Sequence, residues 1–230
     1  MATALVTGAT AGIGRSIARQ LAGHGHNLVL VARDGARLDE FAAEVGRQFH
    51  VEAEVLVADL TDLAASREVE GRLADPDRPV EWLVNNAGFG VKEPFDGSDL
   101  DAEQAMLDVL VQAPMRLTHA ALPGMVARGR GRVLIVSSVA SFLTSGSYSA
   151  AKAWTTVFAE SLSARYRSAG VHVTALCPGF TRTEFHARAA MDTGNVPDWL
   201  WLDADDVAEA GLVACEQGRA VVVPGAVYKG

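Results

Sequence analysis

The chain has 230 residues, 49% of them hydrophobic and 21% charged, and its formal net charge is −8. These values are ordinary for a globular protein, and a chain of this length can bury a sizeable core. An acidic chain without a strong cluster of lysine and arginine argues against nucleic acid and anionic membranes as its main partners.

Short apolar, β-branched runs alternate with amphipathic segments along the whole chain. The runs mostly lack in/out alternation, which is typical of strands buried on both faces, and the segments between them carry apolar residues at helical spacing. We predict seven strands, at residues 4–6, 28–31, 51–57, 82–84, 133–136, 171–176 and 220–223, and six helices, at residues 12–22, 36–49, 64–73, 102–126, 148–168 and 205–216. This alternation predicts a single domain, residues 1–230, with a Rossmann-type doubly wound α/β fold: an approximately seven-stranded parallel sheet with helices on both faces.

The first strand runs into a glycine-rich turn, TGATAGIG at residues 7–14, which opens the first helix. Glycines let the backbone turn tightly and approach a pyrophosphate, and a helix N-terminus offers free N–H groups to it. Because the turn joins a strand to a helix within a βαβ unit, it predicts a dinucleotide-binding site.

The second strand ends at Ala32-Arg33. In dinucleotide-binding folds an acid at this point binds the ribose 2′-hydroxyl of NAD, whereas an arginine accommodates the 2′-phosphate of NADP. Arg33 therefore favours NADP(H) over NAD(H), although Asp34 follows it directly.

A serine pair, Ser137-Ser138, follows the fifth strand, and the sixth helix begins with Tyr148 and Lys152. Residues four apart on a helix share a face, so these two side chains are expected to be neighbours. A nearby ammonium group favours the phenolate and so lowers the pKa of tyrosine, which is ordinarily about 10. The pair is thus a candidate proton donor and acceptor for alcohol and carbonyl chemistry.

Residues 183–203 break the strand–helix rhythm and contain three large aromatic side chains, Phe185, Trp199 and Trp201. A long irregular insertion near the carboxyl end of a strand is a candidate substrate-covering segment. The alternative is a surface segment whose aromatic side chains pack on the core.

Further motifs lie in the same order along the chain: Asp59-Leu60 after the third strand, the Asn-Asn-Ala-Gly turn at residues 85–88 after the fourth, and Pro178-Gly179 after the sixth. Together with the glycine turn and the Ser138, Tyr148 and Lys152 set, they resemble the classical short-chain dehydrogenase/reductase family over essentially the whole chain. The resemblance implies an NADP(H)-dependent oxidoreductase that interconverts a ketone or aldehyde and an alcohol. A non-catalytic or weakly catalytic NADP-binding sensor or scaffold of the same fold is the alternative.

The resemblance also implies roles for individual residues. Tyr148 would be the general acid or base, Lys152 would hold the nicotinamide ribose, and Ser138 would hydrogen-bond the substrate oxygen. Ser137 is the main competitor for this role, and Ser141, Ser145 or Ser147 could also face the site. The implied cofactor-binding residues are Gly8, Thr10, Gly12, Ile13, Gly14, Arg33, Asp59, Leu60, Asn86, Ala87, Gly88, Tyr148, Lys152, Pro178, Gly179, Thr181 and Thr183.

The sequence departs from the family pattern in two ways: the connection between Ser138 and Tyr148, residues 139–147, is shorter than usual, and one position in a helix differs. Members often have an asparagine in the long helix after the Asn-Ala-Gly motif, where it helps to hold a proton-relay water, but Leu110 stands at the matching position. A leucine side chain cannot hydrogen-bond a water. Our hypothesis is that backbone carbonyls or Gln112 hold this water instead.

The remaining expectations concern partners and location. The aromatic residues of 183–203 favour an apolar small-molecule substrate, and the resemblance implies a homodimer or homotetramer formed through helices 102–126 and 148–168. Two cysteines make no disulfide framework, and no run approaches the roughly 20 apolar residues needed to span a bilayer. We therefore predict a cytoplasmic protein with no nucleic acid, membrane or metal partner.

Overall fold

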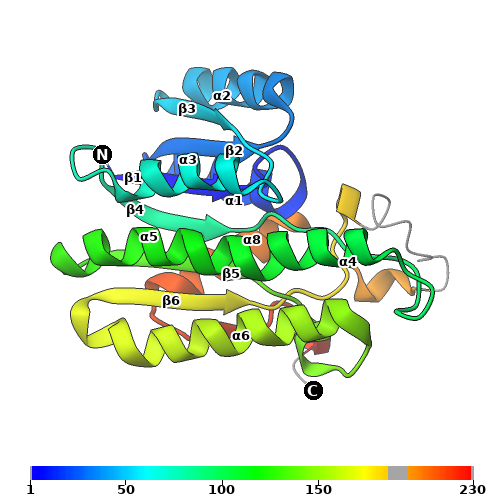
Figure 1. Cartoon of the computed structure of the whole chain (residues 1–230). Helices are drawn as coiled ribbons and strands as arrows, with labels where there is room; N and C mark the ends of the chain where they lie inside the picture. Colours follow the sequence, from blue (N-terminus) through cyan, green and yellow to red (C-terminus); the bar gives the residue numbers. More distant parts are fainter. Residues whose placement is uncertain (1, 186–195, 229–230) are drawn as a thin grey trace.

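All strands of the described residues join one parallel sheet in the order β3-β2-β1-β4-β5-β6-β7 (Figure 1). This computed structural model describes residues 2–185 and 196–228. The strands are β1 (Thr3–Thr7), β2 (Asn27–Ala32), β3 (Ala53–Val57), β4 (Val80–Asn85), β5 (Gly131–Val136), β6 (Val171–Leu176) and β7 (Val221–Val222). The predicted fold class is confirmed, and the predicted strand ends differ from the observed ones by at most two residues.

Seven α-helices connect the strands within the described ranges: α1 (Gly12–Gly23), α2 (Gly35–Phe49), α3 (Leu63–Ala74), α4 (Leu100–Leu107), α5 (Ala113–Ala127), α6 (Gly146–Tyr166) and α8 (Ala204–Glu216). The single helix predicted at residues 102–126 is interrupted by a π-helical turn, Asp108–Gln112, between α4 and α5. Hydrophobic periodicity does not reveal such a turn, because one wide turn shifts the apolar face only slightly.

The sheet is buried on both faces, as its apolar strands predict. Ala4 and Val6 of β1 pack in one core cluster with residues of α1, α2 and α8, whereas Leu5 packs in the other with residues of α3, α5 and α6. Because successive side chains of a strand point to opposite faces, each strand contributes to both clusters.

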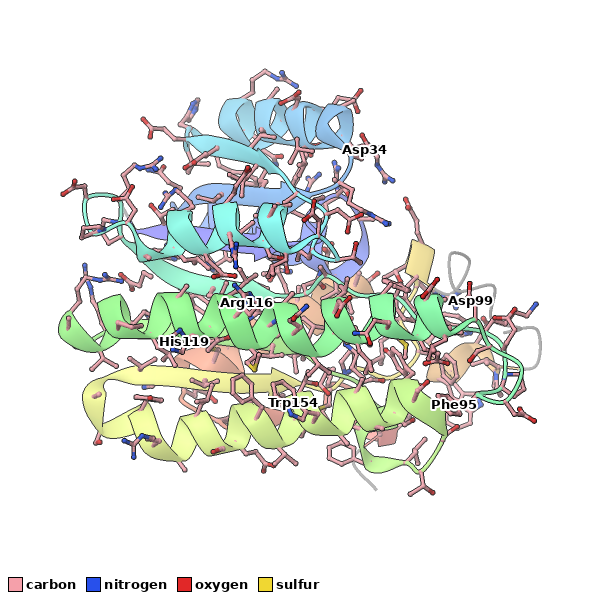
Figure 2. The ribbon with its side chains drawn as sticks, viewed as in Figure 1. Asp34, Phe95, Asp99, Arg116, His119 and Trp154 are labelled. Atoms are coloured by element: carbon pink, nitrogen blue, oxygen red, sulfur yellow. The ribbon has the colours of Figure 1, made fainter. Side chains whose placement is uncertain are left out.

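Aspartates begin four of the helices. Asp34, Asp62, Asp99 and Asp203 each accept a hydrogen bond from a backbone N–H in the first turn of α2, α3, α4 and α8, respectively. Figure 2 labels Asp34 and Asp99 at the starts of their helices. Each such cap stabilises a helix by about 1 kcal/mol.

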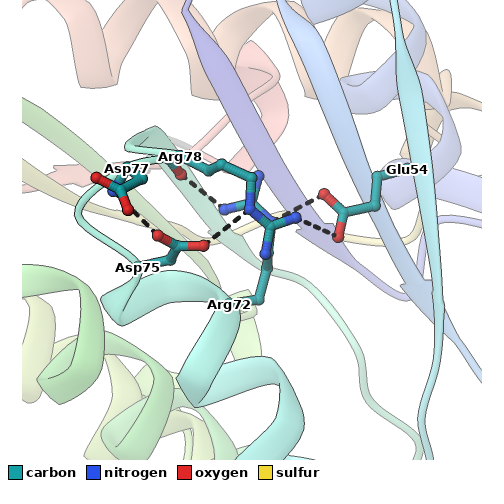
Figure 3. A network of polar contacts seen from close by, with 5 residues as sticks. All are labelled: Glu54, Arg72, Asp75, Asp77 and Arg78. Atoms are coloured by element: carbon teal, nitrogen blue, oxygen red, sulfur yellow. Dashed lines mark hydrogen bonds and ion pairs between the residues drawn. The ribbon is translucent and has the colours of Figure 1, made fainter.

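A polar network joins α3 to strand β3 (Figure 3). The largely buried Arg72 donates from Nε to Glu54 Oε2 at 2.8 Å and from Nη1 to the Arg78 carbonyl oxygen at 2.7 Å. Arg78 in turn pairs with Asp75 at 2.8 Å. These contacts tie the end of α3 and the following loop to the sheet.

The order of the strands creates a crevice beyond the carboxyl ends of the central strands. Strand β1 lies between β2 and β4, so the connections after β1 and after β3 lead in opposite directions across the sheet. Ligands of open α/β sheets bind at such a switch point, beyond the carboxyl ends of the strands. Among the helices of residues 2–185 and 196–228, none combines the length and apolar character needed to cross a lipid bilayer.

Candidate active site

A cleft of about 660 Å³ opens at the carboxyl ends of the strands. All predicted site residues except Gly14 line it: Gly8, Thr10, Gly12, Ile13, Arg33, Asp59, Leu60, Asn86, Ala87, Gly88, Ser138, Tyr148, Lys152, Pro178, Gly179, Thr181 and Thr183. Gly14 is buried beneath the glycine turn, where a Cβ would collide with the Asn86 amide. Motifs that are far apart in the sequence therefore meet in one place.

The glycine turn is held in shape from below by Asn86 and Thr7. The Asn86 amide nitrogen donates to the Thr7 carbonyl at 2.9 Å, and the Thr7 hydroxyl accepts from the backbone N–H groups of Asn86 and Ala87. Gly8 has a φ of +68°, and a Cβ there would lie 2.7 Å from the Asn86 amide. The turn therefore needs glycine, and its open side can admit a pyrophosphate against the backbone, as the dinucleotide-site prediction requires.

Two arginines flank the end of the cleft that is expected to hold the cofactor's ribose. Arg33, after β2, lies 3.9 Å from Asp59, and its side chain is 70% exposed. Arg37 in the first turn of α2 also lines the cleft, although the sequence analysis did not single it out. Its place one helical turn beyond the end of β2 is the signal that could have identified it.

The Asp34 side chain caps the N-terminus of α2. Its Oδ1 accepts from the Arg37 backbone N–H at 3.1 Å. The acid that follows Arg33 thus has a structural role as a helix cap, and it also lines the cleft.

Ser138, Tyr148 and Lys152 come together at the opposite end of the cleft. Ser138 caps a short 3-10 helix, Val139–Phe142, and its side chain lies close enough to the Tyr148 hydroxyl to lower the pKa of that group. Lys152 lies one turn along α6, with its Nζ donating to the Val136 carbonyl at 2.8 Å and lying 5.7 Å from the centre of the Tyr148 ring. The arrangement places a hydroxyl pair and an ammonium group around one point of the cleft.

Ser137 takes a different part from its neighbour. Its hydroxyl donates to the Lys152 carbonyl at 3.0 Å and lies 2.7 Å from the Thr156 hydroxyl. Ser137 is 3% exposed, and its hydrogen bonds connect the end of β5 to α6. Among the serines that the sequence left open, only Ser137 and Ser138 line the cleft, and the geometry favours Ser138 as the one that faces a substrate.

The acid–base properties of the pair differ from the sequence prediction. Burial raises the pKa of Tyr148 to about 12, and the Ser138 hydrogen bond only partly offsets this. Burial also lowers the pKa of Lys152 to about 8. The expected lowering of the tyrosine pKa by Lys152 is therefore wrong for this state of the protein, because desolvation outweighs a charge that is directed at the Val136 carbonyl.

Leu110, at the position where the family pattern has asparagine, does not line the cleft but packs behind Gly88 and Tyr148, which do. It lies in the π-helical turn, is 1% exposed, and packs with Met106, Ala151 and Tyr148 in an apolar cluster. A Cβ on Gly88 would lie only 2.7 Å from Leu110 Cδ2. The Gln112 amide is turned to Asp108, at 3.2 Å, and Gln112 does not line the cleft, so backbone carbonyls are the better candidates for holding a relay water.

A Leu110→Asn variant tests this part of the site. We expect turnover and its pH profile to stay unchanged, while the free energy of unfolding falls by about 1–3 kcal/mol because an amide is buried without partners. Steady-state kinetics and urea unfolding measure the two effects. Leu107→Asn is a matched control, since Leu107 is 38% exposed one turn earlier. A large gain in rate would mean that the natural protein lacks a function that asparagine supplies.

Only part of the predicted substrate-covering segment can be placed. Thr183 and Phe185 line the cleft, and the Phe185 ring centre lies 6.1 Å from that of Tyr148. Trp201 instead packs on Phe180 at 5.7 Å, and Trp199 is 66% exposed. Residues 186–195 of this segment lie outside the described residues. No three His, Cys, Asp or Glu side chains gather as a metal site in the part of the chain that the structure describes.

Comparisons with known proteins agree with this geometry. The model of the family described as short chain dehydrogenase matches residues 2–193. Sulfoacetaldehyde reductase 2 of Chromohalobacter salexigens is 35% identical over 215 residues, which are 89% of this chain and 84% of that protein. Both proteins therefore share the fold over most of their length.

Two solved structures are also similar. A short-chain dehydrogenase from Sphingobium yanoikuyae in complex with NADPH has a TM-score of 0.93 and 33% identity, covering 98% of this chain and 89% of that one. The bulky-bulky ketone specific alcohol dehydrogenase from Comamonas testosteroni has a TM-score of 0.87 and 30% identity, covering 97% and 86%. The chain therefore belongs to the short-chain dehydrogenase/reductase family and is an oxidoreductase that uses a nicotinamide cofactor.

Proposed function

We propose that this enzyme interconverts a ketone or aldehyde and an alcohol with NADP(H), using Tyr148 as general acid and base. The observation that carries the proposal is the meeting of Ser138, Tyr148 and Lys152 at one end of a cleft whose other end is a glycine turn. Such an arrangement joins proton handling to a dinucleotide site.

The preference for NADP(H) rests on charge. Arg33 and Arg37 line the cleft beside the glycine turn, and Asp34, the acid that directly follows Arg33, accepts a bond from the backbone of its own helix. A 2′-phosphate is dianionic or nearly so at neutral pH and binds guanidinium groups well. The NADPH complex of the Sphingobium yanoikuyae relative supports the same choice.

In the reductive direction Tyr148 would donate its proton to the substrate oxygen. The bound nicotinamide supplies the hydride, and the oxygen of the carbonyl becomes increasingly basic as the hydride arrives. With a pKa of about 12, Tyr148 is protonated at neutral pH and so is ready to act as the acid. Ser138 would donate a hydrogen bond to the same oxygen and stabilise the developing charge.

Lys152 would orient the cofactor and restore the proton of Tyr148. Its pKa of about 8 lies near neutral pH, where a group can both give and take a proton. Its ammonium is already fixed by the Val136 carbonyl, so little reorganisation is needed when a ribose hydroxyl approaches.

The substrate we propose is an apolar carbonyl compound. Phe89, Val109 and Phe185 line the cleft, and the Tyr148 ring comes within 3.6 Å of where a Cβ on Gly90 would lie. The bulky-bulky ketone specificity named for the Comamonas testosteroni relative fits such a lining. Residues 183–185, which line the cleft, would then border the substrate.

The function is tested by following NADPH consumption with a panel of aliphatic and aromatic ketones and aldehydes. We expect turnover to be faster with bulky apolar ketones than with small charged aldehydes. Tight NADPH binding without turnover of any compound would instead favour a cofactor-binding sensor or scaffold. NADH in place of NADPH serves as the cofactor control.

We also propose that two copies associate through the outer surface of α5 and α6. These helices lie in front of the sheet in Figure 1, and Figure 2 labels Arg116 and His119 on α5 and Trp154 on α6. Trp154 stacks on Phe158 at 4.6 Å beside Val157, which is 64% exposed. An exposed apolar strip of this kind is typical of an interface.

A Val157→Arg variant tests this interface. We expect light scattering to show a smaller particle than the natural protein, because a charge would be buried between the two copies. The melting temperature of the monomer should change little, since Val157 is exposed. Val213→Arg on α8, at a site 43% exposed, is the control. A monomeric natural protein would rule the interface out.

A further inference from the structure

An ion pair in the wall of the cleft joins two residues that are 147 positions apart in the sequence. Arg37 at the start of α2 contacts Glu184, in the segment after β6, through both ends of its guanidinium group. Nη2 lies 2.9 Å from Oε1 and Nη1 lies 3.3 Å from Oε2. Both residues line the cleft, so the pair is part of its wall.

The same guanidinium group also reaches the glycine turn. Arg37 Nη2 donates to the Thr10 carbonyl oxygen at 3.2 Å. Both terminal nitrogens of Arg37 are therefore engaged, at the end of the cleft where Arg33 also lies. A phosphate group that entered here would need donors that Glu184 already holds.

We propose that Glu184 is a cofactor-specificity residue whose carboxylate competes with the 2′-phosphate of NADP(H) for Arg37. The inference rests on the proposed use of NADP(H). In this view Arg37 exchanges the carboxylate for the phosphate when NADP(H) binds, whereas NAD(H), which has a neutral 2′-hydroxyl, leaves the Arg37–Glu184 pair in place.

Charge and exposure make the exchange feasible. The side chains of Arg37 and Glu184 are 37% and 50% exposed, and a pair this accessible to water holds together only weakly. A phosphate monoester carries nearly two charges and offers three acceptor oxygens, so it is the stronger partner for arginine. The carboxylate nevertheless opposes phosphate binding, both by occupying Arg37 and by like-charge repulsion.

Glu184 is the middle residue of a short segment, residues 183–185, that also contacts other parts of the site. A Cβ on Gly12 would lie 2.9 Å from Thr183, and the next residue after Glu184, Phe185, packs against Tyr148 at 6.1 Å between ring centres. Residues 183–185 thus contact the glycine turn, Arg37 and the proposed catalytic tyrosine in succession. When a phosphate replaces the Glu184 carboxylate on Arg37, residues 183–185 lose the contact between Glu184 and Arg37.

The test is to measure the dissociation constants of NADPH and NADH for the natural protein and a Glu184→Gln variant, by nicotinamide fluorescence. We expect the variant to bind NADPH about threefold to fivefold more tightly, as loss of a competing exposed ion pair predicts. NADH affinity should stay the same. The gain should shrink at high salt, because ions screen exposed charges.

Asp198→Asn is the matched control. It removes the same charge from the same connection, but Asp198 pairs with Arg182 at 3.0 Å and does not line the cleft. Equal tightening by Asp198→Asn would show a general charge effect and overturn the proposal, as would an unchanged NADPH affinity in Glu184→Gln. Thermal melting of both variants checks that they fold.

An Arg37→Ala background separates competition from repulsion. Because repulsion by the Glu184 carboxylate persists without Arg37, Glu184→Gln should bring a smaller gain in NADPH affinity in the Arg37→Ala background than in the natural protein. A full gain in that background would overturn the exchange at Arg37. Failure of the natural protein to bind NADPH at all would instead contradict the proposed function, so the two failures are distinguishable.

Discussion

Replacing Tyr148 with phenylalanine is expected to lower kcat for carbonyl reduction by a factor of about 10² to 10⁴, the range that general acid–base catalysis supplies. The substitution removes only the hydroxyl beside Ser138, and the ring keeps its place against Phe185. NADPH affinity should therefore change little. Stopped-flow measurement of NADPH oxidation, together with fluorescence titration of NADPH, separates the chemical step from binding.

Tyr166→Phe is the control for this prediction. Tyr166 lies at the other end of α6 and outside the cleft, so the same chemical change should leave kcat intact. Retention of most of the activity by Tyr148→Phe would contradict the proposed acid and would point to Ser138 as the proton donor.

The buried ammonium group of Lys152 is expected to make stability depend on pH. Burial lowers its pKa from 10.5 to about 8, and the group is 5% exposed. Between these two values the unfolded chain binds more protons than the folded one, so the free energy of unfolding rises with pH. Below pH 8 the folded protein bears the full cost of a buried charge.

A Lys152→Met variant isolates this contribution. Between pH 7 and pH 9.5 the unfolding free energy of the natural protein should rise, relative to the variant, by on the order of 2 kcal/mol. Urea unfolding across this pH range measures the difference. Both proteins contain Tyr148, so the comparison isolates the contribution of Lys152. Lys92→Met, at an exposed position, is the control and should follow the natural protein. Parallel curves for Lys152→Met would mean that the pKa of Lys152 is not lowered in the folded protein.

Burying Lys152 beside a protonated Tyr148 lowers stability, which indicates that the lysine is there for function. A fold that only needed stability would have an apolar side chain at residue 152. Buried ionisable groups with shifted pKa values gather at catalytic sites, because their proton affinities are set for a reaction. The stability lost at Lys152 is consistent with its proposed part in proton transfer.

The fold could be predicted because its signals are local. Strands buried on both faces need continuous apolar runs, and crossover helices need amphipathic ones, so β1 with α1 and β2 with α2 were evident from periodicity. The glycine turn could also be predicted, because its glycines stand between a strand and a helix. In the structure Gly8 has a φ of +68° and no room for a side chain. Strand and helix ends were less certain, and the π-helical turn at residues 108–112 was missed.

The fold class, the family resemblance and the motifs at the carboxyl ends of the strands could all be predicted from the sequence pattern. Three features became visible only in the folded protein: which serine lies beside Tyr148, the direction in which the pKa of that tyrosine shifts, and the pairing of Arg37 with Glu184. The difference lies in the sequence separation of the interacting residues. Spacing along the chain fixes neighbours within a helix or strand, but burial and contacts between distant elements set proton affinity and charge pairing, and these exist only once the sheet has formed.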